Sequence, residues 1–208
     1  MNILFLGPQG SGKGTQARLL SEKYNLFYFD SGAFLRELSK NNEVVRETLN
    51  KGSFVPNEEM ASYVASFLDE KGLYDGIVFD GFPRDVEQYQ FFKNWLNQKK
   101  IKLDVAFVLN IDETTTVKRL SGRRMDPTTG EIYNLVTDLP PASVDKEKLV
   151  QREDDKPEAI KRRLEVYKKV TVPLINEFQK EIKVVKVNAE GPISDIQKQI
   201  IKEVEKIK

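Results

Sequence analysis

The chain contains neither cysteine nor histidine among its 208 residues. The missing thiols exclude disulfides and thiolate zinc sites, and they leave no sign of the redox compartment. The missing imidazoles remove the commonest general base and metal ligand, which excludes Ser-His-Asp catalysis and histidine-ligated zinc. Any catalysis must therefore use lysine, arginine, carboxylates, hydroxyl groups and the backbone.

The chain also lacks an excess of charge and a long apolar run. Its 33 lysines and arginines nearly balance 32 aspartates and glutamates, so there is no bulk attraction to nucleic acid or to an anionic membrane. No apolar stretch approaches the roughly 18 residues of a membrane helix, and the N-terminus shows no secretory pattern. With 39% hydrophobic and 31% charged residues, we expect a soluble globular protein. The default expectation is a cytoplasmic monomer that binds neither nucleic acid nor membrane.

One glycine-rich segment lies between an apolar run and a helical pattern: Gly7-Pro8-Gln9-Gly10-Ser11-Gly12-Lys13-Gly14-Thr15. Its four glycines tolerate positive φ and let a ligand approach the backbone. Successive backbone N–H groups and the start of a helix suit a phosphate. Lys13 can reach the β- and γ-phosphates of a nucleotide, and the Thr15 hydroxyl can face magnesium. The spacing fits a Walker A loop, except that Gly14 precedes the hydroxyl residue.

Short apolar runs alternate with amphipathic segments along the rest of the chain. We expect strands at Ile3–Leu6, Leu26–Phe29, Ile77–Phe79, Val105–Leu109 and Ile182–Val187. We expect helices at Lys13–Tyr24, Phe34–Ser39, Val44–Leu49, Asn57–Lys71, Val86–Gln98, Glu113–Leu120, Glu158–Lys180 and Ser194–Ile207, with Asn57 as an N-cap. Several strands are apolar on both faces, as buried parallel strands are. The pattern predicts a doubly wound α/β domain with ligands beyond the carboxyl ends of its strands.

Two regions interrupt this alternation. Residues 31–55 form a short helical excursion between the second and third strands. Residues 122–155 lack helical periodicity and carry Asp126-Pro127-Thr128-Thr129-Gly130 and Pro140-Pro141. A structureless loop of that length is uncommon inside a compact domain, so we expect a small inserted subdomain or lid.

A carboxylate and an arginine follow the third strand. Asp80 stands at the strand tip beside the phosphate loop, where magnesium would be held, usually through water. No glutamate follows Asp80, so the acidic pair with which many ATPases activate water is absent. Arg84 closes the segment Gly81-Phe82-Pro83-Arg84.

Arginines form two clusters that flank the second interruption. Arg119, Arg123 and Arg124 precede it, and Arg152, Arg162 and Arg163 follow it. Either cluster alone is compatible with a solvated face, but two clusters around a mobile insert indicate guanidinium groups delivered onto phosphates. Arg119 and Arg123 are four residues apart and share a face if their helix continues. Asp154 and Asp155 could hold these arginines or brace the closed insert, and a purely structural salt-bridge role is the alternative.

The chain resembles an adenylate kinase of the long-lid type. The resemblance is carried by Gly7–Gln16, Phe79–Arg84, Gly122–Arg124, Gln151-Arg152-x-Asp154-Asp155 and Arg163-Leu164. It implies an α/β P-loop fold, a doubly wound five-stranded parallel sheet with two inserted subdomains. The core would comprise residues 1–29, 56–121 and 156–208, with a nucleoside monophosphate-binding insert at 30–55 and a lid at 122–155.

The resemblance also implies residue roles. ATP would be bound by Gly10, Ser11, Gly12, Lys13, Gly14, Thr15, Arg119, Arg123, Ile132, Tyr133 and Gly191. The monophosphate would be bound by Ser31, Arg36, Ser53, Phe54, Val55, Gly81, Phe82, Pro83, Arg84, Gln88, Arg152 and Arg163, with the Gln88 amide reading an adenine edge. The catalytic set would be Lys13, Arg84, Arg123, Arg152 and Arg163, and Asp80 would hold Mg²⁺ through water.

The chain departs from the family pattern at three places. Ser31-Gly32-Ala33 stands where Thr-Gly-Asp is common, and Gln9 replaces the usual proline of the loop. The lid segment after Arg124 has no Cys-x-x-Cys, so structural zinc is rejected. Hydrogen bonds from the polar residues Asp126, Thr128, Thr129 and Asn134 would hold the lid instead.

The resemblance implies reversible phosphoryl transfer from MgATP to AMP, giving two ADP, in adenine nucleotide homeostasis. A kinase with UMP or CMP as acceptor is one alternative, to which the altered Ser31 and Ala33 leave some room. The others are a P-loop module that binds nucleotide without turnover and a P-loop ATPase coupled to motion. The intact lysine and arginines argue against the first of these, and the missing acid after Asp80 argues against the second.

Overall fold

A computed structural model describes residues 1–50, 55–136, 139–152 and 155–207 of the chain. Five strands form one sheet in the order β2-β3-β1-β4-β7, and every neighbouring pair is parallel. The strands are β1 (Ile3–Leu6), β2 (Phe27–Asp30), β3 (Ile77–Asp80), β4 (Val105–Asn110) and β7 (Lys183–Asn188). The predicted doubly wound sheet is therefore confirmed.

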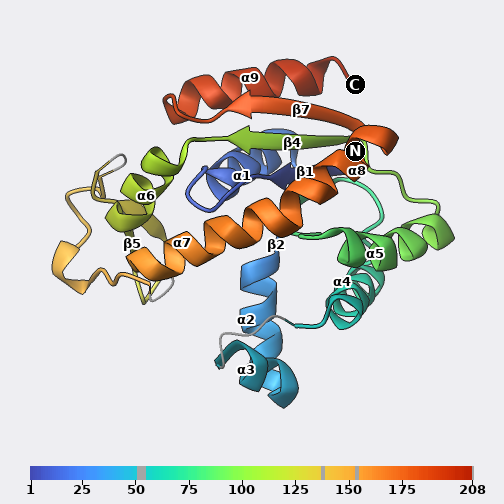
Figure 1. Cartoon of the computed structure of the whole chain (residues 1–208), viewed down its shortest axis with the longest axis horizontal. Coiled ribbons are helices and arrows are strands. Elements are labelled where there is room, and N and C mark those ends of the chain that lie inside the picture. The colour runs from blue at the N-terminus through green and yellow to red at the C-terminus, as the bar shows by residue number, and fades with distance from the viewer. Residues whose placement is uncertain (51–54, 137–138, 153–154, 208) are drawn as a thin grey trace.

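Helices connect and cover these strands (Figure 1). They are α1 (Lys13–Tyr24), α2 (Ser31–Asn41), α3 (Glu43–Asn50), α4 (Asn57–Lys71), α5 (Val86–Lys99), α6 (Glu113–Gly122), α7 (Pro157–Val166), α8 (Val172–Glu181) and α9 (Ile193–Glu205). Figure 1 shows α2 and α3 projecting away from the sheet as an arm. None of the helices within the described ranges is long and apolar enough to span a membrane.

The sheet buries both of its faces because successive side chains of a strand point in opposite directions. On one face, Leu4 and Phe79 pack with apolar side chains of α4, α5 and α8. On the other, Ile3 and Phe5 pack with those of α1 and α9. Burying a large apolar side chain stabilises the fold by about 1.5–3 kcal/mol. Two cores thus fix the strands, and with them the loops at their carboxyl ends.

Two helix predictions are wrong in detail. Asn57 is the first residue of α4 rather than its cap; Pro56 occupies the cap position, and the Asn57 amide donates to Glu87 instead. The single helix expected at 158–180 is divided into α7, a π-helical turn at Tyr167–Thr171, and α8. Pro173, which has no N–H to donate, stands at the start of α8 and accounts for the interruption.

The second interruption contains a small antiparallel pair of strands, β5 (Arg123–Met125) and β6 (Ile132–Asn134). Met125 also bridges to Val150, so the start and the end of this segment are joined. A 3₁₀ turn covers Lys146–Lys148. The described part of residues 122–155 thus has a compact structure of its own.

Candidate active site

The glycine-rich loop joins β1 to α1 and bends sharply at three glycines. Gly7, Gly10 and Gly12 have φ of 144°, 80° and 87°, a region that L side chains rarely adopt. A Cβ at Gly7 would also lie 2.6 Å from the carbonyl oxygen of Leu109. The prediction of positive φ is confirmed for these three glycines and wrong for Gly14, which lies in the first turn of α1.

Gly14 is needed for space rather than for backbone freedom. A Cβ there would lie 3.1 Å from Asp80 Oδ2 and 3.4 Å from the Tyr28 hydroxyl. That hydroxyl donates a hydrogen bond to Asp80 Oδ2 at 3.0 Å. Asp80 is therefore pressed against the start of α1, and this contact explains why glycine precedes Thr15 in the loop.

The surroundings of Asp80 suit a hydrated divalent cation. Burial raises the pKa of Asp80, Lys13 opposes that shift, and Asp30 adds to it. Asp30 is the register partner of Asp80 on the neighbouring strand, and Thr15 is exposed in the first turn of α1. Carboxylate and hydroxyl oxygens are the ligands that Mg²⁺ prefers. The residues present at this strand tip therefore fit magnesium or its water.

The Lys13 ammonium donates to the carbonyl oxygens of Gly7 at 2.7 Å and Pro8 at 2.9 Å, which curl the loop around it. Burial lowers the pKa of Lys13 to about 8, while Asp80 opposes the shift. The positive charges of Arg84, Arg163 and Arg123 lower that pKa further. Cations from three separate elements thus act on one lysine.

Arg84 is fixed at both its side chain and its backbone. Its Nε donates to the Gly81 carbonyl at 2.8 Å and its guanidinium donates to Ser31 Oγ at 3.2 Å. Ser31 donates in turn to Gly81 at 2.9 Å. The Arg84 N–H donates to Gln88 Oε1 at 2.7 Å. The structure thus brings Ser31, Gly81, Arg84 and Gln88 together, with the Gln88 oxygen already engaged by Arg84.

The other residues expected at the monophosphate site are more dispersed. Arg36 lies against Gly32: a Cβ added at Gly32 would lie 3.2 Å from the Arg36 guanidinium. Phe82 and Val55 are buried in the core, and the Phe82 ring packs edge-on against the ring of Phe92 in α5. Pro83 is also buried. Ser53 and Phe54 lie outside the described residues.

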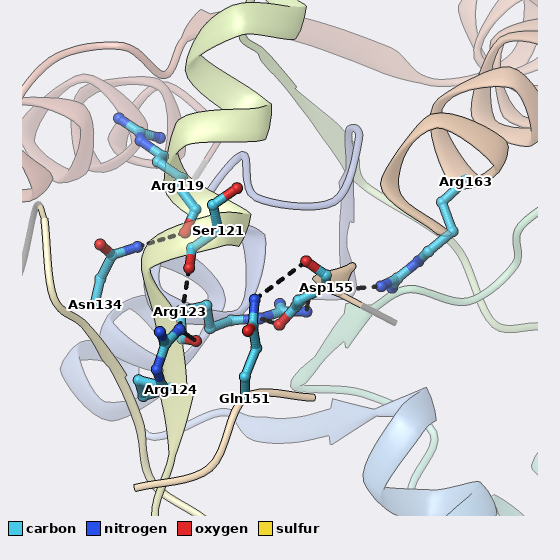
Figure 2. Close-up of polar contacts among 8 residues, drawn as sticks. All are labelled: Arg119, Ser121, Arg123, Arg124, Asn134, Gln151, Asp155 and Arg163. Atoms are coloured by element: carbon cyan, nitrogen blue, oxygen red, sulfur yellow. Dashed lines mark hydrogen bonds and ion pairs between the residues drawn. The ribbon is translucent and has the colours of Figure 1, made fainter. Parts of the chain in front are cut away.

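A buried aspartate links the two arginine clusters (Figure 2). Asp155 is fully buried and accepts from Arg123 Nε at 2.7 Å and from its terminal nitrogen at 2.5 Å. Arg163, on α7, lies 4.0 Å from the same carboxylate. The Gln151 amide donates to the backbone carbonyl of Asp155, and the backbone N–H of Asp155 donates to the carbonyl of Arg152. The ion pair of Asp155 with Arg123 is common to the expected role of holding arginines and to that of a structural salt bridge, and Asp154 lies outside the described residues.

Arg119 and Arg123 do not share a helix face. Helix α6 ends at Gly122, and Arg123 is already in β5. Arg124 turns back to its own backbone, donating to the carbonyls of Ser121 and Arg123. The first arginine cluster is therefore divided between a helix and a strand.

Arg119 instead spans the loops on either side of it. Its guanidinium donates at 3.4 Å to the carbonyl of Gly10 and at 3.4 Å to that of Glu190, the residue before Gly191. Its own carbonyl accepts from Asn134 in β6 at 2.7 Å (Figure 2). Arg119 thus joins the phosphate loop, the β7–α9 loop and the lid.

The turn between β5 and β6 is held by short-range hydrogen bonds. Asp126 Oδ1 accepts the N–H groups of Thr128 at 2.7 Å and Thr129 at 3.3 Å, and the Thr129 hydroxyl accepts from the Glu131 N–H at 3.2 Å. In β6, Ile132 is exposed, and the Tyr133 hydroxyl donates to Glu131, which raises the pKa of Tyr133 to about 12. The turn is therefore built without any metal-binding thiol.

Comparison with known proteins agrees with this geometry. The family model described as adenylate kinase matches residues 5–183. The chain belongs to the adenylate kinase family. It is 34% identical to the adenylate kinase of Petrotoga mobilis, covering 96% of this chain and 95% of that one. It is 36% identical to that of Thermococcus kodakarensis (96% and 92%) and 33% identical to that of Kosmotoga olearia (100% of both). The adenylate kinase family consists of nucleoside monophosphate kinases, which are phosphotransferases, so the resemblance stated from the sequence is confirmed.

Proposed function

We propose that the carboxyl edge of the sheet catalyses reversible transfer of the terminal phosphoryl group of MgATP to AMP, giving two ADP. The observation that carries this assignment is the geometry of the glycine-rich loop: the Lys13 ammonium is held by the Gly7 and Pro8 carbonyls, and Asp80 lies against the start of α1. The charges of Arg84, Arg123 and Arg163 also lower the pKa of Lys13. A loop that binds phosphates and three arginines around one lysine suit the charge of two nucleotides and of the phosphoryl group between them.

The mechanism requires no protein base, because the acceptor is already an anionic phosphate oxygen. This agrees with a chain that has no histidine. Lys13 and the loop N–H groups hold the ATP phosphates, and Arg84 orients the acceptor phosphate. Arg123, Arg152 and Arg163 stabilise the negative charge that develops during transfer. Asp80 would hold the magnesium that accompanies ATP, through water, and that ion would supply neutralisation of the phosphate charge.

The paired arginines suggest how water is excluded. Arg123 at the start of the lid and Arg163 on α7 meet at Asp155, which keeps both guanidinium groups near Lys13. Closing residues 122–155 over the nucleotides would deliver these groups and expel the water that would otherwise hydrolyse ATP. The division into a core, a monophosphate insert at 30–55 and a lid at 122–155 belongs to this proposal, as does a cytoplasmic monomer that binds no nucleic acid.

The remaining assignments concern substrate recognition. ATP would contact Gly10–Thr15 and Arg119, with its base near Ile132, Tyr133 and Gly191. AMP would contact Ser31, Arg36 and residues 53–55, Gly81–Arg84 and Gln88, and Arg152. Because the Gln88 oxygen accepts from the Arg84 N–H, its amide NH₂ is the group that would face the adenine.

The test is to incubate the protein with ATP, Mg²⁺ and each nucleoside monophosphate in turn and to follow diphosphate formation. Fast ADP formation with AMP alone supports the proposal. A preference for UMP or CMP moves the error to Ser31, Ala33 and Gln88. No transfer with any acceptor overturns the proposed reaction.

Lys13→Met gives a sharper test of the site. We expect turnover to fall by at least about a hundredfold, the loss typical of one lost transition-state contact, with an unchanged circular dichroism spectrum. Lys198→Met is the matched control, because Lys198 is an exposed lysine that pairs only locally with Asp195. Lys13→Met turnover close to that of the control would remove Lys13 from the chemistry.

A further inference from the structure

The helix after the lid is widened at one place. At Tyr167–Thr171 the backbone forms a π-helical turn, in which the Val172 N–H donates to the carbonyl of Tyr167, five residues earlier. Pro173 cannot donate, and its ring would clash with the carbonyl four residues before it, so the regular α-helical pattern fails here. Single π-helical turns inside helices are often found at functional sites. This turn is therefore a candidate functional feature as well as a consequence of Pro173.

The turn contacts the site through a hydroxyl group. Thr171 is its last residue, and the Thr171 hydroxyl donates to the backbone carbonyl of Arg84 at 2.8 Å. The two residues are 87 positions apart in the chain. Because Thr171 belongs to the widened turn, the path of the backbone there sets where its hydroxyl lies relative to Arg84.

Arg84 is thereby held at four points. Its N–H donates to Gln88, its carbonyl accepts from Thr171, and its guanidinium is bonded to Gly81 and Ser31. Three of these contacts come from residues within four positions of Arg84 or from the β2–α2 junction. The bond from Thr171 connects Arg84 to the helix pair that also bears Arg163.

The other side of the turn is also anchored. Lys168 forms an ion pair with Glu113, in the first turn of α6. The turn is thus tied both to the helix that leads into the lid and to the arginine of the monophosphate site.

We propose that Thr171 is a positioning residue for Arg84, setting the guanidinium that binds the acceptor phosphate. This inference rests on the proposed role of Arg84. A hydroxyl-to-carbonyl bond fixes the peptide after Arg84, and a displacement of about 1 Å at a reacting group can lower the rate by roughly a hundredfold. The loss of one net hydrogen bond changes an equilibrium constant by about three- to tenfold. We therefore expect the affinity for AMP and the KM for AMP to change.

The experiment compares Thr171→Val, which removes the hydroxyl and keeps the shape, with Thr171→Ser, which keeps the hydroxyl. We expect Thr171→Val to raise both the KM for AMP and the calorimetric Kd for AMP about three- to tenfold, with the KM for ATP within twofold of wild type. Thr171→Ser should restore the AMP values. Ser21→Ala is the matched control, because it removes a hydroxyl that donates to the carbonyl of Arg18 at 2.7 Å within α1.

Three results would overturn the inference: AMP values unchanged in Thr171→Val, equal losses for AMP and ATP, or no recovery in Thr171→Ser. An equal loss for both nucleotides would indicate general destabilisation rather than positioning. Failure of the wild-type protein to phosphorylate any monophosphate would instead overturn the proposed reaction, so the two failures are distinguishable.

Discussion

Replacing Asp155 by asparagine should destabilise the protein by removing the charge that pairs with Arg123. Asp155 has no exposed side-chain surface and receives two charge-assisted hydrogen bonds from Arg123, at 2.7 and 2.5 Å. Removing one partner of a fully buried pair costs about 3–5 kcal/mol. The Arg123 side chain is 17% exposed, so it can recover some hydration, and asparagine keeps one acceptor oxygen. We therefore expect a loss of about 2–3 kcal/mol.

Thermal unfolding measures this loss directly. For a chain of this size, 1 kcal/mol lowers Tm by about 2–4 °C, so Asp155→Asn should unfold roughly 5–10 °C below the wild type. Glu37→Gln is the control, because its partner Lys40 is exposed and one helical turn away, and such pairs contribute little.

A double-mutant cycle isolates the pair from other effects of the substitution. Asp155→Asn, Arg123→Met and the double variant should give a coupling free energy well above 0.5 kcal/mol, the usual limit for independent sites. Coupling below that value, or a Tm equal to that of Glu37→Gln, would refute the view that Asp155 holds Arg123 in the absence of nucleotide.

Two further predictions concern the phosphate loop. Gly14→Ala favours helix formation by about 1 kcal/mol, yet the added Cβ must displace Asp80 or Tyr28. We expect at least about tenfold lower turnover and a higher Mg²⁺ requirement. A wild-type dependence of turnover on Mg²⁺ would contradict the argument that the Cβ crowds Asp80. The low pKa of Lys13, about 8 without nucleotide, means that its charged form is lost above that pH. Because kcat/KM reports the free enzyme, kcat/KM for ATP should fall above about pH 8. Bound phosphates raise the pKa of a neighbouring lysine, so kcat should persist to higher pH; parallel profiles would argue against this assignment.

The fold was predictable because burial on both faces leaves a direct mark on the sequence. Runs such as Val105–Leu109 are apolar at every position, and they lie in the centre of the sheet. The glycine-rich loop was equally clear, since positive φ at Gly7, Gly10 and Gly12 restricts residue choice. These features depend on local geometry or on burial, which sequence pattern records well.

The details of the site depend on contacts between distant segments, which a single sequence does not record. No sequence pattern marks Tyr28 as a site residue, although its hydroxyl donates a hydrogen bond to Asp80, 52 positions away in the chain. The role of Gly14 was misread as backbone freedom, because only the folded chain places Asp80 beside it. The π-helical turn could have been anticipated from Pro173, whose effect lies four residues upstream; its contact with Arg84 could not.

The position of β1 has a consequence for synthesis of the chain. β1 is the central strand of the sheet, and Ile3 pairs with Val78 on one side and with Val105 on the other. Such distant parallel pairings slow folding and leave apolar strands uncovered until their partners arrive. The phosphate loop is therefore synthesised before β3 and β4, and the strand that carries it is complete in the sheet only after both have been made. A nascent chain stalled before β4 should bind no ATP and should depend on chaperones to keep β1 from aggregating.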